Sequence, residues 1–299
     1  LFPEDITVAE VLKKAGYGTG GFGKWGLGNQ GKDGAAERQG FDLFYGYYNQ
    51  WHAHTYYTHL FRNSKKVDLD GRYTHHAIFD ETIKFIKNNK DKPFFLYCPW
   101  TPPHAAYQIP EDEPAWKMYK DKPWPHDARV AAAMDTMMDR HVGEITALLK
   151  KLGLYQNTLM FFTSDNGAAK RFDGIHNSSG VMQGKKRSLN EGGIRVPMVV
   201  RWPGKIKAGR VSSHPWYFPD VMPTFAEIGG VSTEVPKDID GISILPTLLD
   251  EGEQKLHEYM FWHYGVRAVR SGKWKGIGKG GHLYLYDLSK DIEEKNDLS

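Results

Sequence analysis

The stretch Thr158-Leu159-Met160-Phe161-Phe162-Thr163-Ser164-Asp165-Asn166-Gly167 begins as an apolar run and ends abruptly in polar residues. Such a short run, bounded by turn residues, is typical of a buried strand. Asp165 and Asn166 place a carboxylate and an amide oxygen side by side, and hard cations such as Ca²⁺ prefer oxygen ligands. Two ligands are only part of a Ca²⁺ site, which takes about 6–8 oxygens. Asp, Asn and Gly are also ordinary turn residues, so a plain turn stays an alternative.

Two other predicted strands end in the same way. Residues 17–22 lead to Lys24, and residues 93–98 lead to His104 through a stiff turn with two prolines. In an open α/β sheet, ligands bind beyond the carboxyl ends of the strands. We therefore expect these polar strand ends to converge on one crevice.

Helical periodicity alternates with these strands. It predicts helices over residues 7–15, 74–90, 127–152 and 219–228, the first with the capping-box pair Thr7 and Glu10. In the third helix the predicted buried stripe is Met134, Met138, His141, Ile145, Leu148 and Leu152. Residues 40–64 show no clear periodicity, and we expect a structured loop there.

The pattern changes after residue 255. Residues 258–263, 266–270, 274–277 and 283–288 resemble short strands joined by glycine turns. Strands that alternate with helices and then give way to hairpins predict an α/β fold followed by a small antiparallel sheet. We place the main domain at residues 1–254 and the antiparallel subdomain at residues 255–299.

Composition excludes several classes of protein. The 299 residues carry 39 basic and 36 acidic side chains, a net charge of +3, with no dense basic tract, so nucleic acid is not an expected partner. Cys98 is the one cysteine, which rules out an internal disulfide framework and a CxxC motif. The longest apolar runs are too short to span a bilayer. A mixed globular protein remains.

Further candidate residues lie on loops. His104 follows the proline turn, and a neutral imidazole can give or take a proton near pH 7. Lys186 and Arg187 lie on a glycine-rich loop that could hold an oxyanion. The alternatives are a histidine bonded to a backbone carbonyl and a solvated surface loop.

Residues 51–57, with His52 and His54 among aromatic side chains, could form a platform for a sugar ring. A zinc site on this His-x-His pair lacks visible partners. Cys98 lies inside an apolar strand and is expected to be a buried small hydrophobe.

The order of the motifs resembles that of the type I, formylglycine-dependent sulfatases, in the alkaline phosphatase superfamily. The similar segments span nearly the whole chain: Gly23-Lys24-Trp25-Gly26-Leu27-Gly28, Thr101-Pro102-Pro103-His104-Ala105-Ala106, Phe162-Thr163-Ser164-Asp165-Asn166-Gly167, Lys186 with Glu191-Gly192-Gly193-Ile194-Arg195-Val196-Pro197, Arg201-Trp202-Pro203-Gly204-Lys205-Ile206 and Leu285-Tyr286-Asp287-Leu288. Residues 40–63 look like those of bacterial arylsulfatase or N-acetylgalactosamine-6-sulfatase-like members that act on sulfated glycans.

The resemblance implies an alkaline-phosphatase-like mixed sheet sandwiched by helices, with a small C-terminal antiparallel sheet. It implies a sulfuric ester hydrolase that uses Ca²⁺ and formylglycine on a sulfated carbohydrate, located in the periplasm or outside the cell. By position, Asp165 and Asn166 would be metal ligands, Lys24 and Lys186 would hold sulfate oxygens, and His104 would protonate the leaving alcohol. Substrate contacts are expected at His52, His54, His176 and Arg187.

Two positions depart from the family pattern. The family usually has His two residues after the lysine of the Lys-Trp pair, and this chain has Gly26 there. We expect His52 or His54 to reach in instead. The family's nucleophile motif, C/S-x-P/A-x-R, would lie upstream of residue 1, and Cys98-Pro99-Trp100-Thr101-Pro102 does not match it. A phosphate or phosphonate ester hydrolase and a non-catalytic glycan-binding relative remain as alternatives.

Overall fold

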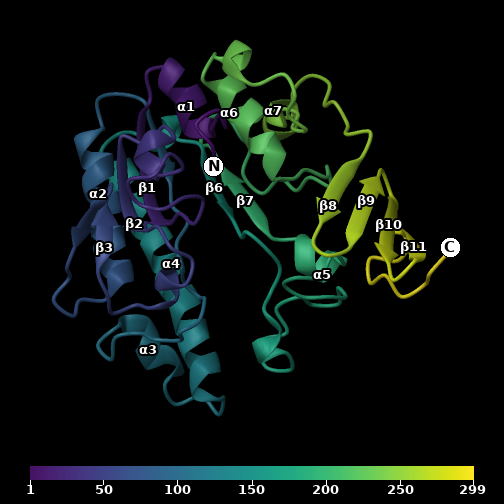
Figure 1. The fold of residues 1–299 in the computed structure, drawn as a ribbon, viewed down its shortest axis with the longest axis horizontal. Coiled ribbons are helices and arrows are strands. Elements are labelled where there is room, and N and C mark those ends of the chain that lie inside the picture. Colours follow the sequence, from purple (N-terminus) through teal and green to yellow (C-terminus); the bar gives the residue numbers. More distant parts are fainter. The chain divides into compact units, whose positions relative to one another are not determined.

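The computed structural model describes residues 1–299, which form two compact units (Figure 1). The first unit consists of Leu1–Asn157 and Phe218–Leu245, and the second of Thr158–Tyr217 and Pro246–Ser299. The domain boundary that we predict between residues 254 and 255 stays a prediction.

A five-stranded mixed sheet forms the centre of the first unit, in the order β4-β3-β2-β1-β5. Its strands are β1 (Gly18–Lys24), β2 (Leu43–Tyr47), β3 (Leu60–Arg62), β4 (Lys65–Val67) and β5 (Phe94–Tyr97). Strand β1 pairs in parallel with both β2 and β5, and β3 and β4 add an antiparallel edge. The carboxyl ends of the three parallel strands therefore lie at one edge of the sheet.

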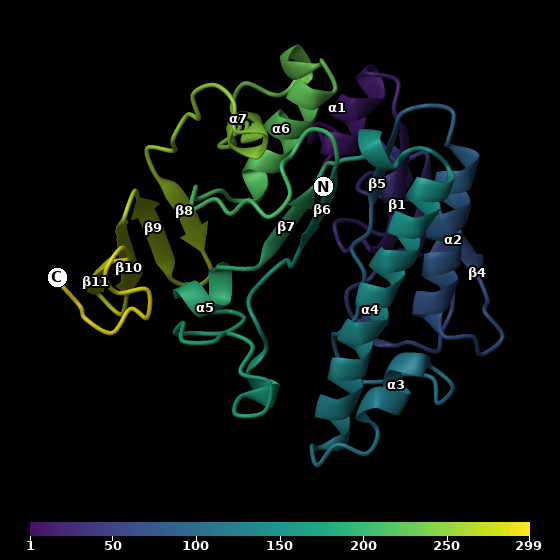
Figure 2. The ribbon, with the colours of Figure 1, turned by 180° about the vertical axis from the view of Figure 1, so that it is seen from behind.

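The helices of the first unit agree with the predicted ones and add a short one. They are α1 (Val8–Lys14), α2 (Thr74–Asn88), α3 (Pro114–Tyr119), α4 (His126–Lys151) and α6 (Val221–Ile228), with 3₁₀ turns at Ala36–Arg38, His52–His54, Tyr155–Asn157, Phe218–Asp220 and Ser232–Glu234. Both hydrogen bonds of the α1 capping box are present: the Thr7 side chain accepts the Glu10 backbone N–H, and the Glu10 side chain accepts the Thr7 backbone N–H. Helix α4 runs beside α2, and α1 lies beside α6 (Figures 1 and 2).

Both faces of the sheet are covered by helices. Alternate residues of a strand point to opposite faces, so Tyr45 and Tyr47 pack in the cluster that contains Ile78 of α2. Phe44 and its neighbours pack with Ala9 of α1 in a second cluster. The mixed sheet between helices, expected from the family resemblance, is thus confirmed.

The prediction of a loop over residues 40–64 was wrong, because this segment supplies strands β2 and β3. The buried stripe of α4 also differs from the prediction. Its buried larger side chains are Met134, Met137, His141, Ile145 and Leu149, so Met138 and Leu148 do not belong to it. Met137 is buried in place of Met138 and Leu149 in place of Leu148, and the predicted Leu152 is only half-buried, at the C-cap of the helix.

The second unit contains two antiparallel sheets. Strands β6 (Met160–Thr163) and β7 (Met198–Arg201) pair with each other, and β8 (Met260–His263), β9 (Arg267–Ser271), β10 (Trp274–Lys279) and β11 (His282–Asp287) form a sheet in the order β11-β10-β9-β8. The short helix α5 (Glu191–Ile194) and a 3₁₀ turn at Lys170–Phe172 lie between β6 and β7 in the sequence. Helix α7 is Leu245–Leu249. The predicted C-terminal antiparallel sheet is confirmed.

A small core joins the C-terminal sheet to the segment around α5. Ala268, Ile277 and Tyr286 of the sheet cluster with Leu189, and Ile194 packs against them. The loop before α5, which carries Lys186, is thus supported by apolar burial. None of the helices combines the length and apolar character needed to cross a lipid bilayer.

Candidate active site

Lys24 is the last residue of β1, at the carboxyl edge of the parallel strands. Its backbone N–H donates to the carbonyl of Pro99 over 2.8 Å. Gly23, at φ 140°, permits this approach, because a Cβ atom there would lie 2.2 Å from the Pro99 oxygen. The end of β1 is therefore held against the segment that leads from β5 to His104.

The orientation of His104 is fixed by backbone contacts on both sides. Its Nδ1 lies 2.9 Å from the carbonyl oxygen of Ala105, which assigns the proton to Nδ1 in the neutral ring. The hydroxyl of Tyr56 donates to the His104 carbonyl over 2.9 Å. Nε2 is therefore the ring atom suited to exchange a proton with a substrate.

The structure brings His54 and His104 together. Their rings are stacked, with centroids 4.1 Å apart and an interplanar angle of 12°. The N–H of Ala106 donates to the His54 carbonyl over 2.8 Å, which ties the two loops at the backbone. His54 is thus well placed to restrict the His104 ring.

His52 faces a different neighbourhood from His54. Its ring packs against that of His59 at a tilt of 35°, with centroids 4.3 Å apart, and its Nε2 lies 3.0 Å from the hydroxyl of Thr58. Burial, followed by the charge of His59, lowers the pKa of His52.

The space beside Gly26 is filled by Gln50. A Cβ atom at Gly26, which has φ 72°, would lie 1.9 Å from Nε2 of Gln50. A histidine at this position would therefore require the Gln50 side chain to move. Gln50 is a candidate site residue that sequence reasoning missed, since nothing in the sequence pairs it with Gly26. Whether His52 or His54 takes over the family histidine's role stays a prediction.

Asp165 and Asn166 follow β6 in a turn that packs on α5. The N–H of Gly167 donates to the carbonyl of Gly193 over 2.9 Å, and a Cβ atom at Gly167 would lie 2.0 Å from the Gly192 oxygen. The side-chain nitrogen of Asn166 donates to the Gly167 carbonyl over 2.9 Å, which leaves its oxygen available as a ligand. Asp165 is exposed, and no hydrogen bond or ion pair engages its carboxylate.

Lys186 lies next to this turn. Its backbone N–H donates to the carbonyl of Ala168 over 2.8 Å, so the second unit brings Asp165, Asn166 and Lys186 into one neighbourhood. Arg187, at φ 75°, is exposed. His176 packs on Phe172, with ring centroids 5.2 Å apart.

The donor atoms fit a hard cation in kind. A carboxylate and an amide oxygen are ligands that Ca²⁺ accepts, and both belong to a turn held by backbone hydrogen bonds. No group of three or more His, Cys, Asp or Glu side chains in residues 1–299 is arranged to hold a metal ion. A Ca²⁺ site built on this pair would therefore need further oxygen ligands.

The predicted site residues are divided between the two units. Lys24, His104, His52 and His54 belong to the first, and the remaining five belong to the second. Their convergence across the units stays a prediction. Cys98 packs against the core beneath the first sheet, and burial raises the pKa of its thiol to about 12, so that it stays protonated at neutral pH.

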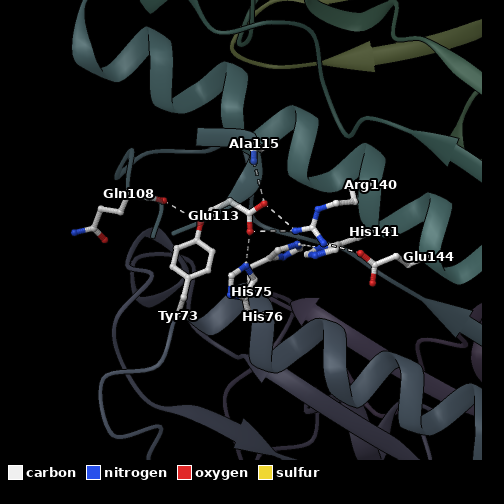
Figure 3. Close-up of polar contacts among 9 residues, drawn as sticks. All are labelled: Tyr73, His75, His76, Gln108, Glu113, Ala115, Arg140, His141 and Glu144. Carbon is white, nitrogen blue, oxygen red and sulfur yellow. Dashed lines mark hydrogen bonds and ion pairs between the residues drawn. The ribbon is translucent and has the colours of Figure 1, made fainter. Parts of the chain in front are cut away.

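A buried polar cluster supports the chain that follows His104 (Figure 3). Glu113, 3% exposed, accepts two hydrogen bonds from Arg140 (2.8 and 3.1 Å) and lies 3.0 Å from Nε2 of His76. Burial alone would raise the pKa of Glu113, but the Arg140 contact brings it below its usual value. Tyr73 donates to the Gln108 carbonyl over 2.9 Å. These contacts attach the segment after His104 to α2 and α4.

Two family models match the chain. The model described as Sulfatase matches residues 3–231, and that described as N-sulphoglucosamine sulphohydrolase, C-terminal, matches residues 183–299. Arylsulfatase of Hemicentrotus pulcherrimus is 30% identical over 296 residues, which cover 91% of this chain and 51% of that protein. N-acetylgalactosamine-6-sulfatase of Mus musculus is 30% identical, over 94% of this chain and 55% of that protein.

A solved structure agrees with these relatives. Ps i-CgsB in complex with k-i-k-neocarrahexaose has a TM-score of 0.83 and 29% sequence identity, over 98% of this chain and 69% of that one. The chain spans about half the length of the curated relatives just described. The matches cover both units and all the predicted site residues, and the chain belongs to the sulfatase family.

Proposed function

We propose that the protein is a sulfuric ester hydrolase that removes sulfate from a sulfated carbohydrate. Its family membership supports this function, as do relatives named for arylsulfate and N-acetylgalactosamine-6-sulfate hydrolysis. The observation that carries the proposal is the geometry of His104, whose Nδ1 is committed to the Ala105 carbonyl at the carboxyl edge of the sheet. An imidazole held in this way presents Nε2 to a leaving group.

His104 is proposed to act as the general acid. A sugar alkoxide is a poor leaving group and needs a proton as the S–O bond breaks. Protonated Nε2 would supply it, while the Nδ1 bond and the His54 stack keep the ring in place. Lys24 and Lys186 are proposed to hold the sulfate oxygens, because ammonium groups neutralise the charge that is spread over a sulfuryl group.

Asp165 and Asn166 are proposed to hold part of a Ca²⁺ site. The bound cation would stabilise negative charge on the sulfate oxygens. The formylglycine nucleophile that the resemblance implies would come from a segment upstream of residue 1. We further propose that His52, His54, His176 and Arg187 contact the carbohydrate, and that the protein works in the periplasm or outside the cell.

Sulfate release by the full-length protein tests this function directly. We expect free sulfate from sulfated oligosaccharides, measured by ion chromatography, and faster turnover of an aryl sulfate than of the matching aryl phosphate. A strong preference for the phosphate would replace the proposal with a phosphate ester hydrolase. Oligosaccharide binding without any sulfate release would instead indicate a glycan-binding protein.

A further inference from the structure

A cavity of about 420 Å³ opens in the first unit, next to the carboxyl ends of β1 and β2. Four of its lining residues are aromatic, and we refer to them as the floor: Tyr48, His52, His59 and Phe61. The rings of His52 and His59 are tilted by 35° to each other with centroids 4.3 Å apart, and Phe61 packs edge-on to His59 at 5.3 Å. The ring of Tyr48, which is 1% exposed, lies 5.5 Å from that of Phe61 and supports it from within the core. Because each ring packs against a neighbouring ring, their positions are mutually restricted.

The other four lining residues are polar, and we refer to them as the rim: Asn29, Gln30, Lys32 and Asn49. Asn29, Gln30 and Asn49 contribute amides, which can donate and accept hydrogen bonds with sugar hydroxyls. Lys32 is exposed on the same rim and forms no ion pair within residues 1–299. An aromatic floor with a few directed polar groups is the usual construction of a small-ligand site.

No carboxylate lines this cavity. The carboxylate of Glu37, which is not among the lining residues, accepts hydrogen bonds from the hydroxyls of Tyr48 and Ser64. The lining therefore combines one ammonium group with two imidazoles and contains no acidic side chain.

We propose that this cavity binds a second anionic sugar residue of the substrate glycan, bearing a sulfate or a carboxylate group. Lys32 would pair with the anionic group, the rim amides would bind the hydroxyls, and the sugar ring would lie on the His59 side of the floor. The identity of the ligand as part of the substrate rests on the proposed function. The cavity lies on the same sheet edge as Lys24, with Asn29 only five residues further along the chain.

Calorimetric titration of the full-length protein tests this site. The probe is a carrageenan hexasaccharide with two sulfates per disaccharide, compared with its chemically desulfated counterpart and with an oligogalacturonate of equal length. The titrations use a His104→Ala background, so that hydrolysis does not consume the probe. Lys32→Ala is compared with Lys87→Ala, an exposed lysine on α2 that lies outside the cavity.

We expect Lys32→Ala to weaken binding of the sulfated probe about tenfold or more, as the loss of a charge-assisted contact does, and Lys87→Ala to have no effect. The desulfated probe should bind weakly to both variants. Tighter binding of the oligogalacturonate would assign the site to carboxylates. Equal affinities of the two variants for both anionic probes would overturn the proposal.

The test of the cavity can fail or succeed independently of the test of the proposed function. A Lys32-dependent affinity in a protein whose unsubstituted form releases no sulfate would support the cavity and contradict the hydrolase. Sulfate release by the unsubstituted protein, with no dependence of binding on Lys32, would overturn the cavity alone.

Discussion

His75 and His141 form a buried pair of neutral imidazoles. They are 1% and 2% exposed, and Nε2 of His75 lies 3.0 Å from Nδ1 of His141. Such a bond needs one N–H and one bare nitrogen, so it breaks when both rings are protonated. Burial, followed by the repulsion between the two rings when both are charged, lowers the pKa of His75 well below 6.5. Burial, followed by the charge of Arg140, lowers that of His141 to about 3.

This pair predicts a loss of stability in mild acid. Both pKa values are lower in the folded state, so the unfolded chain binds more protons below pH 6.5. The stabilisation is complete above pH 6.5 and is lost as the pH falls from 6.5 toward 3, by about 1.4 kcal/mol per pH unit for each ring. Urea unfolding between pH 7 and pH 4.5 measures it. The double variant His75→Gln/His141→Asn, which offers amides in place of the two nitrogens, should show a smaller slope. An equal slope would contradict the assignment.

If His104 is the general acid, the loss of turnover on its substitution should depend on how good the leaving group is. His104→Ala should lower turnover of an alkyl or sugar sulfate by about 10²–10⁴-fold, because the alkoxide then leaves without a proton. Turnover of an activated aryl sulfate should fall much less. Steady-state rates on both substrates measure the difference, with His126→Ala, an exposed histidine in the same unit, as the matched control. Equal losses on both substrates would argue against the role.

The proposed metal ligand Asp165 predicts a loss of Ca²⁺ binding. Asp165→Ala should lower the Ca²⁺ content of the purified full-length protein and abolish its activity, since a carboxylate is the strongest ligand type in such a site. Elemental analysis gives a readout that does not depend on turnover. Asp238→Ala, at an exposed position in the other unit, serves as the control. Full activity with normal Ca²⁺ content would refute the assignment.

Among the elements of the second unit, β10 carries a buried lysine. Lys275 is 0% exposed, and its Nζ lies 2.8 Å from carboxylate oxygens of both Glu191 and Glu294. Glu294 also accepts the backbone N–H of Glu191 over 2.7 Å. The three charges thus fasten the C-terminal sheet to the first turn of α5, beside the loop that carries Lys186.

Breaking this triplet should be costly. Lys275→Met leaves two carboxylates buried without their cation, which typically destabilises a fold by about 3–5 kcal/mol. The free energy of unfolding from urea titration measures the loss. Lys279→Met, at an exposed position on the same strand, removes the same charge and should cost far less. Similar values for the two variants would show that the triplet does not stabilise the unit.

The elements that the sequence predicts well carry a clear local signal. Helix α2 has one apolar face, and the four C-terminal strands are separated by glycine turns; the positions of all five were confirmed. Strand β2 was missed because both of its faces are buried, with Tyr45 toward one core and Phe44 toward the other. Buried on both sides, it has no alternation of polar and apolar residues. Helix α3 has only six residues, too few for a clear period.

At the scale of the whole molecule, sequence reasoning found candidate residues but not their neighbours. The motif order pointed to His104 and Lys24, yet the stack of His54 on His104 and the filling of the Gly26 space by Gln50 depend on tertiary contacts. His54 and His104 are 50 residues apart in the chain, and Gly26 and Gln50 are 24 apart. Local sequence preferences do not predict contacts between residues so far apart in sequence. The division of the candidates between two units was equally invisible, because the first unit is discontinuous in sequence.

This discontinuity predicts how the first unit opens. Phe218–Leu245, called the returning segment below, belongs to the first unit although Thr158–Tyr217 of the second unit precedes it in the sequence. In it, the ring of Phe225 of α6 packs against that of Phe95 of β5, with centroids 6.0 Å apart. The buried hydroxyl of Thr224 accepts the N–H of Ile244 over 3.0 Å, so Thr224→Val leaves that N–H unpaired, at a cost of about 1–3 kcal/mol. Native-state hydrogen exchange should then accelerate in α1 and β1 as well as in α6, roughly tenfold for each 1.4 kcal/mol, because these elements open as one unit.

The strands of the C-terminal sheet, which belong to the other unit, should exchange at their original rates in Thr224→Val. Thr233→Val, an exposed threonine in the same returning segment, is the matched control and should leave all rates unchanged. Acceleration confined to Phe218–Leu245 would show that this segment opens locally. In that case, the integrity of the sheet edge that carries Lys24 and His104 would not depend on the returning segment.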